Sequence, residues 1–242
     1  MSKIIAIIPA RYNSTRLPGK VLEKIGNKTI LELVYKNVQQ AKYIDEIIIA
    51  TDDQKIIDTA SSFGANAEMT FSSHKSGTDR CAQVSREFWE DDVILNIQAD
   101  EPFIDPEIID LLALKMKDDN WIEIATLCTN INNPAEISDP NTVKVVKDIY
   151  NKALYFSRSI IPYYRDKDSG NSFHKHIGIY AYRNKILQSI TSLKESKLEK
   201  AEKLEQLRWM ENGYKIHIFE TEYQGFGIDT VEDLERARKN LL

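Results

Sequence analysis

In the first half of the chain, short unbroken runs of apolar residues alternate with segments in which apolar residues recur every three or four positions. The run at 4–8 is unbroken, and those at 46–50 and 93–98 are largely apolar; all three are typical of strands buried on both faces, as in a parallel sheet. The periodic segments at 30–42 and after Pro106 predict amphipathic helices. Strands that alternate with helices are the signature of βαβ units, so the pattern predicts an α/β fold with a mixed, mostly parallel sheet flanked by helices.

The pattern changes after residue 123, where turns and irregular loops replace helices as the connections. Strands are predicted at 124–129, 143–147, 153–157, 176–182 and 215–220. A helix is predicted at 197–212, and Thr230 with Asp233 marks the start of a terminal helix. We expect a smaller region of mixed or antiparallel pairing in this half. The segment 160–175, with little periodicity, is a candidate mobile loop or contact arm.

The composition is that of one globular domain spanning residues 1–242. Apolar residues make up 42% of the 242 residues, which is enough to fill a large core. The formal net charge of -5 argues against nucleic acid as the main partner. Cys81 and Cys128 show no sign of a disulfide framework, and no apolar run of about 18 residues would insert into a membrane. We therefore expect a cytoplasmic protein.

The first predicted strand runs into a loop that carries three cations, Arg11, Arg16 and Lys20, and no acid. Pro18 and Gly19 form a turn in which the backbone can approach a ligand closely. A loop directly after a buried first strand is where phosphates are commonly received, so this loop predicts a small anionic ligand. It lacks the glycine spacing of a Walker A motif. The alternative is a solvated surface turn.

Asp100 and Asp229 are candidate metal ligands. Asp100 follows the strand predicted at 93–98, and Asp229 precedes the terminal helix, so each has the alternative role of a helix cap. If they meet beside a triphosphate, a divalent cation has to lie between the negative charges, and Mg²⁺ takes one or two carboxylates plus phosphate oxygens and water. His174 and His176 do not predict zinc, because no third Cys or His stands at ligand spacing.

Four further polar residues have both a structural and a functional interpretation. Arg158 is either an exposed turn residue or a guanidinium fork for a carboxylate. His176 is either a packed strand residue or a hydrogen-bonding contact to a substrate. Glu205 and Gln206 lie among the core leucines of a predicted helix, where a solvated face is the alternative. The residues alone leave these choices open.

The segment 9–20, PARYNSTRLPGK, closely resembles the signature of the sugar-acid cytidylyltransferases. Later segments, in the same order, resemble the family of 3-deoxy-D-manno-octulosonate (Kdo) cytidylyltransferases. They are ATD at 50–52, HKSGT at 74–78, NIQADEP at 96–102, KVV at 144–146, ALYFSR at 153–158, HIGIY at 176–180, LEQLR at 204–208 and IDT at 228–230. The match spans nearly the whole chain.

The resemblance implies a Rossmann-like nucleotide-diphospho-sugar transferase fold. It also implies the reaction of CTP with Kdo to give CMP-Kdo and pyrophosphate, for lipopolysaccharide biosynthesis. By matching position, the catalytic residues would be Lys20, Arg11 and Asp100, and the nucleotide contacts Ala10, Arg11, Ser14, Lys20 and Ser76. The sugar-acid contacts would be Gln98, Arg158, His176, Glu205 and Gln206. Asp100 and Asp229 would hold Mg²⁺.

The resemblance further implies a homodimer, with a sugar-binding and dimer-contact insertion at about 140–175. One position departs from the family's pattern, because Ala99 replaces the glycine of the usual Gly-Asp-Glu tripeptide. If that glycine has a positive φ, alanine would strain the turn by about 1 kcal/mol.

Three other functions remain open. A cytidylyltransferase for 8-amino-Kdo or a sialic acid would share most of these motifs. A glycosyltransferase with an acidic metal motif would use the same fold, although the loop from Arg11 to Lys20 favours a triphosphate over an intact sugar nucleotide. A non-catalytic nucleotide sensor is the third, and the retention of Lys20, Asp100 and Asp229 argues against it.

Overall fold

The structure is a computed structural model that describes residues 2–13, 17–166 and 172–240. The strands are β1 (Ile4–Ala10), β2 (Lys24–Ile25), β3 (Lys28–Thr29), β4 (Glu46–Thr51), β5 (Asn66–Met69), β6 (Val93–Asn96), β7 (Ile124–Asn130), β8 (Lys144–Lys147), β9 (Ala153–Ser157), β10 (His174–Arg183) and β11 (Ile216–Glu220). The helices are α1 (Ile30–Val38), α2 (Gln54–Ser62), α3 (Gly77–Val84), α4 (Pro106–Asp118), α5 (Pro134–Ser138), α6 (Asn184–Thr191), α7 (Lys197–Glu202), α8 (Glu205–Glu211) and α9 (Val231–Asn240), with 3-10 turns η1 (Lys20–Leu22) and η2 (Ser85–Glu87).

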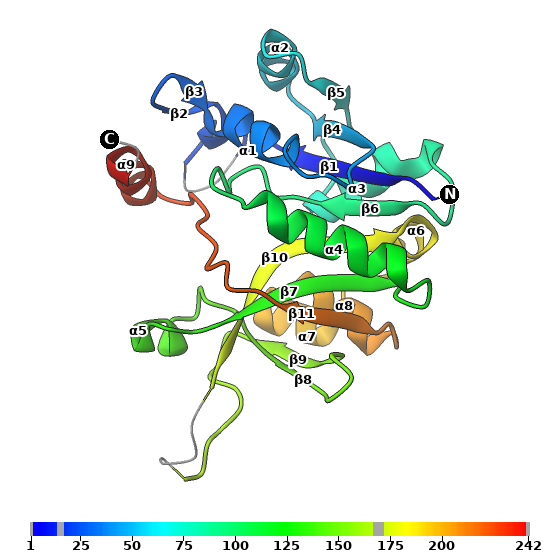
Figure 1. Ribbon diagram of the computed structural model, residues 1–242, viewed down its shortest axis with the longest axis vertical. Helices are drawn as coiled ribbons and strands as arrows, with labels where there is room; N and C mark the ends of the chain where they lie inside the picture. Colours follow the sequence, from blue (N-terminus) through cyan, green and yellow to red (C-terminus); the bar gives the residue numbers. More distant parts are fainter. Residues whose placement is uncertain (1, 14–16, 167–171, 241–242) are drawn as a thin grey trace.

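Within the described residues, nine strands form one mixed sheet whose central path runs β11-β7-β10-β6-β1-β4-β5 (Figure 1). β1 pairs in parallel with β4 on one side and with β6 on the other. β10 is antiparallel to both β6 and β7, whereas β11 is parallel to β7. β8 and β9 form an antiparallel extension beside β10. The predicted α/β class and the predicted change to mixed pairing after residue 123 are both confirmed.

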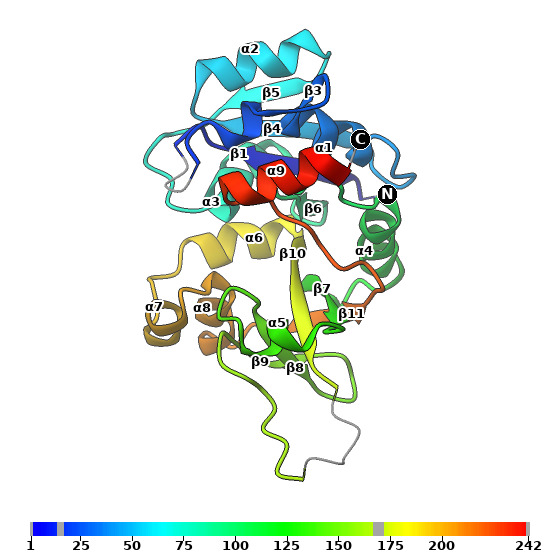
Figure 2. The same ribbon diagram turned by 90° about the vertical axis from the view of Figure 1, so that its left-hand side faces the viewer.

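The sheet is covered on both faces, which explains the unbroken apolar run of β1. Ile4, Ala6 and Ile8 belong to one buried cluster, which includes residues of α1 and α4. Ile5 and Ile7 belong to a second buried cluster, which includes residues of α3, α6 and α8. Figure 2 shows α4 on one side of β6 and β10, and α3 and α6 on the other. A strand buried on both faces has no polar side to alternate with, as the sequence pattern indicated.

Two helical features differ from the sequence expectation. The helix expected at 197–212 is two helices, α7 and α8, separated by Lys203 in the left-handed region (φ 54°) and by Leu204 in extended conformation. Leu198 of α7 is 38% exposed, whereas Leu204 is buried. Helices α5 and α6 were not expected at all, although Ile186, Leu187 and Ile190 of α6 are buried at helical spacing.

The parallel strands β1, β4 and β6 end at the same edge of the sheet, so the loops that follow them are neighbours there. Helix α9 lies at this end of the molecule, in contact with β2 (Figures 1 and 2). In the part of the chain that the structure describes, no helix is both long and apolar enough to cross a membrane.

Candidate active site

Lys20 lies at the centre of the candidate site, with only 8% of its surface exposed. It follows Gly19, whose left-handed backbone (φ 71°) makes the turn into η1. The Lys20 Nζ donates hydrogen bonds to Asp100 Oδ2 at 2.6 Å and to Asp229 Oδ1 at 2.8 Å. The three residues come from segments that follow β1, β6 and β11. The fold therefore brings together the cation and the two acids that the sequence singled out.

The ammonium group of Lys20 uses every donor it has. Its third hydrogen bond goes to the carbonyl of Ile228 at 2.9 Å, and a lysine has only three donors. Burial alone would lower the pKa of Lys20, but the attraction of Asp100 and Asp229 outweighs burial and raises the pKa above its ordinary value. Lys20 is thus fully charged and must release at least one acceptor before it can bind a phosphate.

A polar cleft of about 230 Å³ borders these ion pairs. Of the residues predicted from the sequence, it is lined by Arg11, Lys20, Gln98, Asp100 and Asp229. Arg80, which the sequence reasoning missed, also lines it and is buried, with hydrogen bonds to Asp52 at 2.7 Å and Thr70 at 2.6 Å. Ala10 is buried at the end of β1, and Ser14 and Arg16 lie outside the described residues.

The alternative interpretation of Asp100 and Asp229 as helix caps is wrong. Helix α4 is capped by Asp105, whose carboxylate accepts from the backbone N–H of Glu107 at 2.9 Å. Helix α9 is capped by Thr230, whose hydroxyl accepts from the backbone N–H of Asp233 at 3.1 Å. Both carboxylates instead face Lys20. Their loops are also joined directly, because the N–H of Ile228 donates to the carbonyl of Asp100 at 2.9 Å.

Ala99 does not strain the turn beside Asp100. Within the described residues, the non-glycine positions with a positive φ are Asn151 and Lys203, so Ala99 adopts ordinary backbone angles. The alanine is buried and lines the cleft. Alanine would have been costly only at a positive φ, and Ala99 does not have one.

Glu205 begins α8 and reaches the first turn of α3. Its Oε1 accepts from Ser76 Oγ at 3.0 Å and from Arg208 Nη2 at 2.6 Å, and its Oε2 accepts from Thr78 Oγ1 at 2.6 Å. Burial raises the pKa of Glu205, while the hydrogen bond from Thr78 and the charge of Arg208 oppose this shift. The interpretation of Glu205 as a solvated helix residue is therefore wrong. Nothing in the sequence pattern pointed to Thr78 or Arg208 as its partners.

Gln206, the next residue of α8, is buried, 6% exposed. The solvated-face interpretation is wrong for this residue too. Gln206 belongs to α8, which begins after the break at Lys203 and Leu204.

His176 lies on β10 next to two aromatic side chains. Its ring packs against Phe156 and Tyr180, with ring centroids 5.1 and 5.2 Å apart. Tyr180 in turn packs against Trp209 of α8 at 5.3 Å, so His176 and α8 share one aromatic cluster. Burial lowers the pKa of His176 to about 3, which makes the imidazole neutral at ordinary pH.

The hydrogen bonds of Thr126 identify which nitrogen of His176 carries the proton. The Thr126 hydroxyl lies 2.7 Å from the carbonyl of Ile179 and 2.9 Å from His176 Nε2. Its single proton goes to the carbonyl, which can only accept, so the hydroxyl accepts from Nε2. This assignment leaves Nδ1 of His176 as a hydrogen-bond acceptor.

Arg158 lies at the end of β9, where its guanidinium binds backbone carbonyls. Nε donates to the carbonyl of Glu202 at 2.7 Å, and Nη1 donates to the carbonyl of Pro140 at 2.7 Å. The first of these bonds satisfies a carbonyl at the carboxyl end of α7 and so caps that helix. The sequence did not indicate this capping role.

The predicted site residues do not share one cavity. Gln98 donates to the carbonyl of Gly178 at 3.3 Å, which links the cleft around Lys20 to β10. His176 lines a separate pocket, and this pocket meets the cleft at Asp229. Ser76 and Glu205 line a third pocket. Arg11, Lys20, Asp100 and Asp229 thus line one cleft, whereas the predicted sugar contacts Gln98, His176 and Glu205 line three different pockets.

The donor set at Asp100 and Asp229 fits a magnesium ion that brings further ligands with it. Within residues 2–13, 17–166 and 172–240, no three His, Cys, Asp or Glu side chains are grouped to hold a metal. Two carboxylates are, however, close enough to share one ammonium group. Mg²⁺ is commonly held by one or two carboxylates together with substrate phosphates and water. The pair is therefore suited to a metal that arrives with a nucleotide.

The fold and this charged cleft define a nucleotidyltransferase. The chain matches the family model described as "Cytidylyltransferase" over residues 5–216. The structure also resembles that of a 4-diphosphocytidyl-2C-methyl-D-erythritol synthase from Anaerococcus prevotii, with a TM-score of 0.64 at 18% identity, covering 99% of this chain and 96% of that one. At this identity the likeness shows the fold alone.

More similar proteins narrow the assignment. A 3-deoxy-manno-octulosonate cytidylyltransferase from Solibacter usitatus is 49% identical, covering 98% of this chain and 94% of the relative. The corresponding protein from Parabacteroides distasonis is 47% identical, covering 98% and 97%. The structure of a CMP:2-keto-3-deoxy-manno-octonic acid synthetase complexed with CTP has a TM-score of 0.94 at 43% identity, covering 99% and 98%. The chain therefore belongs to the cytidylyltransferase family, and within it to the 3-deoxy-manno-octulosonate cytidylyltransferases.

Proposed function

We propose that this enzyme transfers the cytidylyl group of CTP to Kdo, with release of pyrophosphate. The observation that carries the proposal is the cleft in which Lys20 meets Asp100 and Asp229, with Arg11 on its wall. The names of the relatives support the same substrates, as does the similar synthetase structure, which is complexed with CTP. The anomeric hydroxyl of the sugar acid attacks the α-phosphorus in line with the leaving pyrophosphate.

Arg11 and Lys20 bind and orient the triphosphate in this scheme. Their positive charges stabilise the negative charge that grows on the phosphoryl oxygens and on the leaving pyrophosphate. Lys20 is held in place by its turn at Gly19 and exchanges at least one of its present acceptors for a phosphate oxygen. Ala10, Ser14 and Ser76 would complete the nucleotide contacts, as the sequence resemblance implies.

We further propose that Asp100 and Asp229 hold Mg²⁺ in the complex with nucleotide. When bound, the cation would neutralise phosphate charge and make the α-phosphorus more electrophilic. In the free protein, the ammonium of Lys20 neutralises these two carboxylates. A magnesium ion that replaces the ammonium beside them would carry the same sign of charge.

For the sugar acid we propose contacts from Gln98, Arg158, His176, Glu205 and Gln206. Nδ1 of His176 accepts a hydrogen bond from a sugar hydroxyl, since its neutral ring has that nitrogen unprotonated. Arg158 would have to leave the carbonyl of Pro140 to bind the sugar carboxylate, while its bond to Glu202 can remain.

The sugar specificity is tested by pyrophosphate release from CTP with Kdo, 8-amino-Kdo or a sialic acid, each with and without Mg²⁺. We expect release with Kdo and Mg²⁺. A preference for another sugar acid would reject Kdo as the substrate. Hydrolysis of an intact sugar nucleotide without use of CTP would indicate a glycosyltransferase, and CTP binding without release would indicate a sensor.

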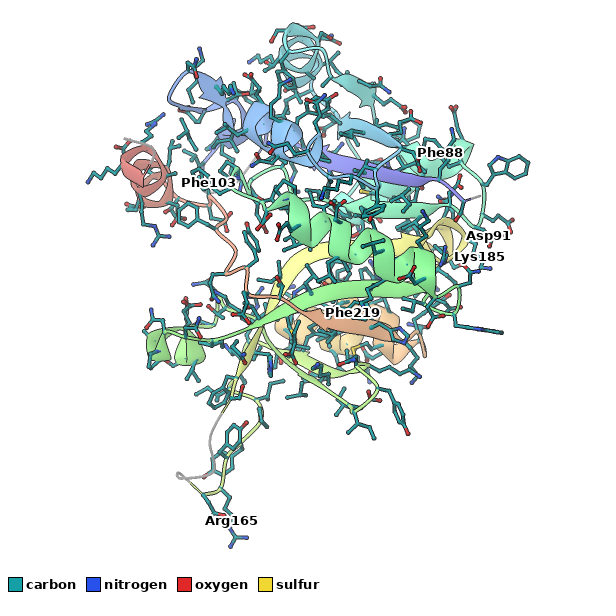
Figure 3. The ribbon with its side chains drawn as sticks, in the orientation of Figure 1. Phe88, Asp91, Phe103, Arg165, Lys185 and Phe219 are labelled. Carbon is teal, nitrogen blue, oxygen red and sulfur yellow. The ribbon has the colours of Figure 1, made fainter. Side chains whose placement is uncertain are left out.

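We also propose a cytoplasmic homodimer that contacts its partner through the region at about 140–175. Large apolar side chains are exposed there, including Ile149 (88%), Leu154 (60%) and Tyr163 (87%). The segment after β9 extends away from the sheet, with Arg165 far from the other labelled side chains (Figure 3). Burying such residues in a second copy would remove apolar surface from water.

Light scattering after size exclusion tests the dimer. We expect a dimer mass for the wild type and a monomer mass for Leu154→Asp. Trp121→Asp is the control, because Trp121 is 90% exposed but lies outside the proposed contact region. A monomeric wild type would reject the dimer.

A further inference from the structure

Thr78 is a buried residue that is hydrogen-bonded to Glu205, one of the proposed sugar contacts. Thr78 is not itself among the predicted site residues. Its hydroxyl donates to Glu205 Oε2 at 2.6 Å, and only 4% of the residue is exposed. Ser76 and Arg208 bind the other carboxylate oxygen, Oε1. Thr78 is therefore the described partner that fixes the orientation of Oε2.

The first turn of α3 is a rigid support for this hydrogen bond. Ser76 and Asp79 form a capping box, in which each side chain accepts from the backbone of the other. Between Ser76 and Thr78, a Cβ on Gly77 would come within 3.0 Å of Pro9 Cγ, so the turn packs closely against the end of β1. Gly77 also lines the cleft around Lys20. The Thr78 hydroxyl is thus held at a fixed position relative to the nucleotide site.

Glu205 is held by Arg208 from within its own helix and by Ser76 and Thr78 from the start of α3. As the first residue of α8, it follows an extended Leu204 and a left-handed Lys203, so no preceding helical turn restrains it. A carboxylate that binds a substrate hydroxyl must be held within a fraction of an ångström of its productive position. For Oε2, the donor that supplies this restraint is Thr78 on α3.

We propose that Thr78 is a positioning residue, which orients the Glu205 carboxylate toward the sugar acid from the rigid first turn of α3. The proposal rests on the proposed function, in which Glu205 contacts the sugar. It assigns Thr78 to recognition of the sugar acid, although the helix that carries it borders the nucleotide cleft.

The test compares Thr78→Val, which keeps the shape but removes the donor, with Thr78→Ser, which keeps the donor. KM for Kdo and for CTP, kcat and the melting temperature are measured for both variants and the wild type. A hydrogen bond to a charged group is worth enough to change binding by about tenfold. We expect Thr78→Val to raise KM for Kdo about tenfold and to leave KM for CTP within about twofold, while Thr78→Ser stays near the wild type in both.

The outcomes separate positioning from a purely structural role. A lower melting temperature with unchanged KM for Kdo would overturn the proposal, as would an equal rise in both KM values. If Thr78→Val does not fold, Thr78→Ala, which does not overfill the site, is measured in the same way and by the same criteria. A wild-type protein that releases no pyrophosphate from CTP and Kdo would overturn the proposed function as well. If the wild type is active and Thr78→Val has the same KM for Kdo as the wild type, only the positioning role is overturned.

Discussion

Replacing Lys20 with methionine removes the cation at the centre of the site while keeping a side chain of similar length. The change deletes three hydrogen bonds, to Asp100 Oδ2, Asp229 Oδ1 and the carbonyl of Ile228. It also leaves two carboxylates facing each other without a positive charge between them. Lys24→Met is the control, because Lys24 is an exposed lysine on β2.

The expected loss of stability follows from how exposed each partner is. The side chain of Asp100 is 28% exposed, so its bond contributes about 1.5–2 kcal/mol. That of Asp229 is 44% exposed, and we reduce its bond to about 0.5 kcal/mol because of solvent screening. The carbonyl bond adds about 1 kcal/mol. Because methionine avoids the cost of burying an ammonium group, we expect a net loss of about 2 kcal/mol.

For a chain of this length, that loss corresponds to a fall in melting temperature of about 4–8 °C. Differential scanning calorimetry without ligands measures it. If Lys20 also stabilises the developing phosphoryl charge, kcat for pyrophosphate release should fall by about 10²–10³. If Lys20→Met has the melting temperature of the wild type and a kcat within about twofold of it, Lys20 contributes neither to stability nor to catalysis.

Three further changes test other parts of the account. Asp100→Asn or Asp229→Asn should abolish magnesium-dependent pyrophosphate release while circular dichroism shows a retained fold; normal turnover would reject the metal assignment. Because burial lowers the pKa of His176 to about 3, the unfolded chain binds more protons between that pH and about 6.5, so stability should fall as pH falls through this window. His176→Gln should reduce this dependence, by at most about 1.4 kcal/mol per pH unit in urea titrations, and an unchanged dependence would contradict a ring that stays neutral in the folded protein. Ala99→Gly should destabilise the protein by about 0.5–1 kcal/mol, since Ala99 has ordinary backbone angles; a gain in stability would reveal strain.

The periodicity of the sequence was enough to predict most of the sheet. β1 and β6 were recognisable because strands buried on both faces need unbroken apolar runs. The break at Lys203 was not predictable, because lysine and leucine are good helix formers and the break depends on tertiary contacts. One of these is the hydrogen bond from Arg158 to the carbonyl of Glu202, 44 positions away.

The candidate site was predictable where residue type alone suggests the chemistry. Lys20, Asp100 and Asp229 carry charges at positions where a strand ends or a helix starts, which indicated an anion site and a metal site. Their direct contact could not be predicted, because Asp100 is 80 residues and Asp229 is 209 residues away from Lys20 in the sequence. Thr78 was missed for a similar reason, since a threonine in the first turn of a helix is common and its partner Glu205 is 127 residues away.

The central claim is that the cleft around Lys20 activates Kdo with CTP. Its most direct test is pyrophosphate release by the purified protein with CTP, Kdo and Mg²⁺, together with mass-spectrometric detection of the product. We predict one equivalent of pyrophosphate for each CMP-Kdo formed, and no release when CTP, Kdo or Mg²⁺ is omitted. Release without Kdo, or a different nucleotide sugar as the product, would contradict this claim.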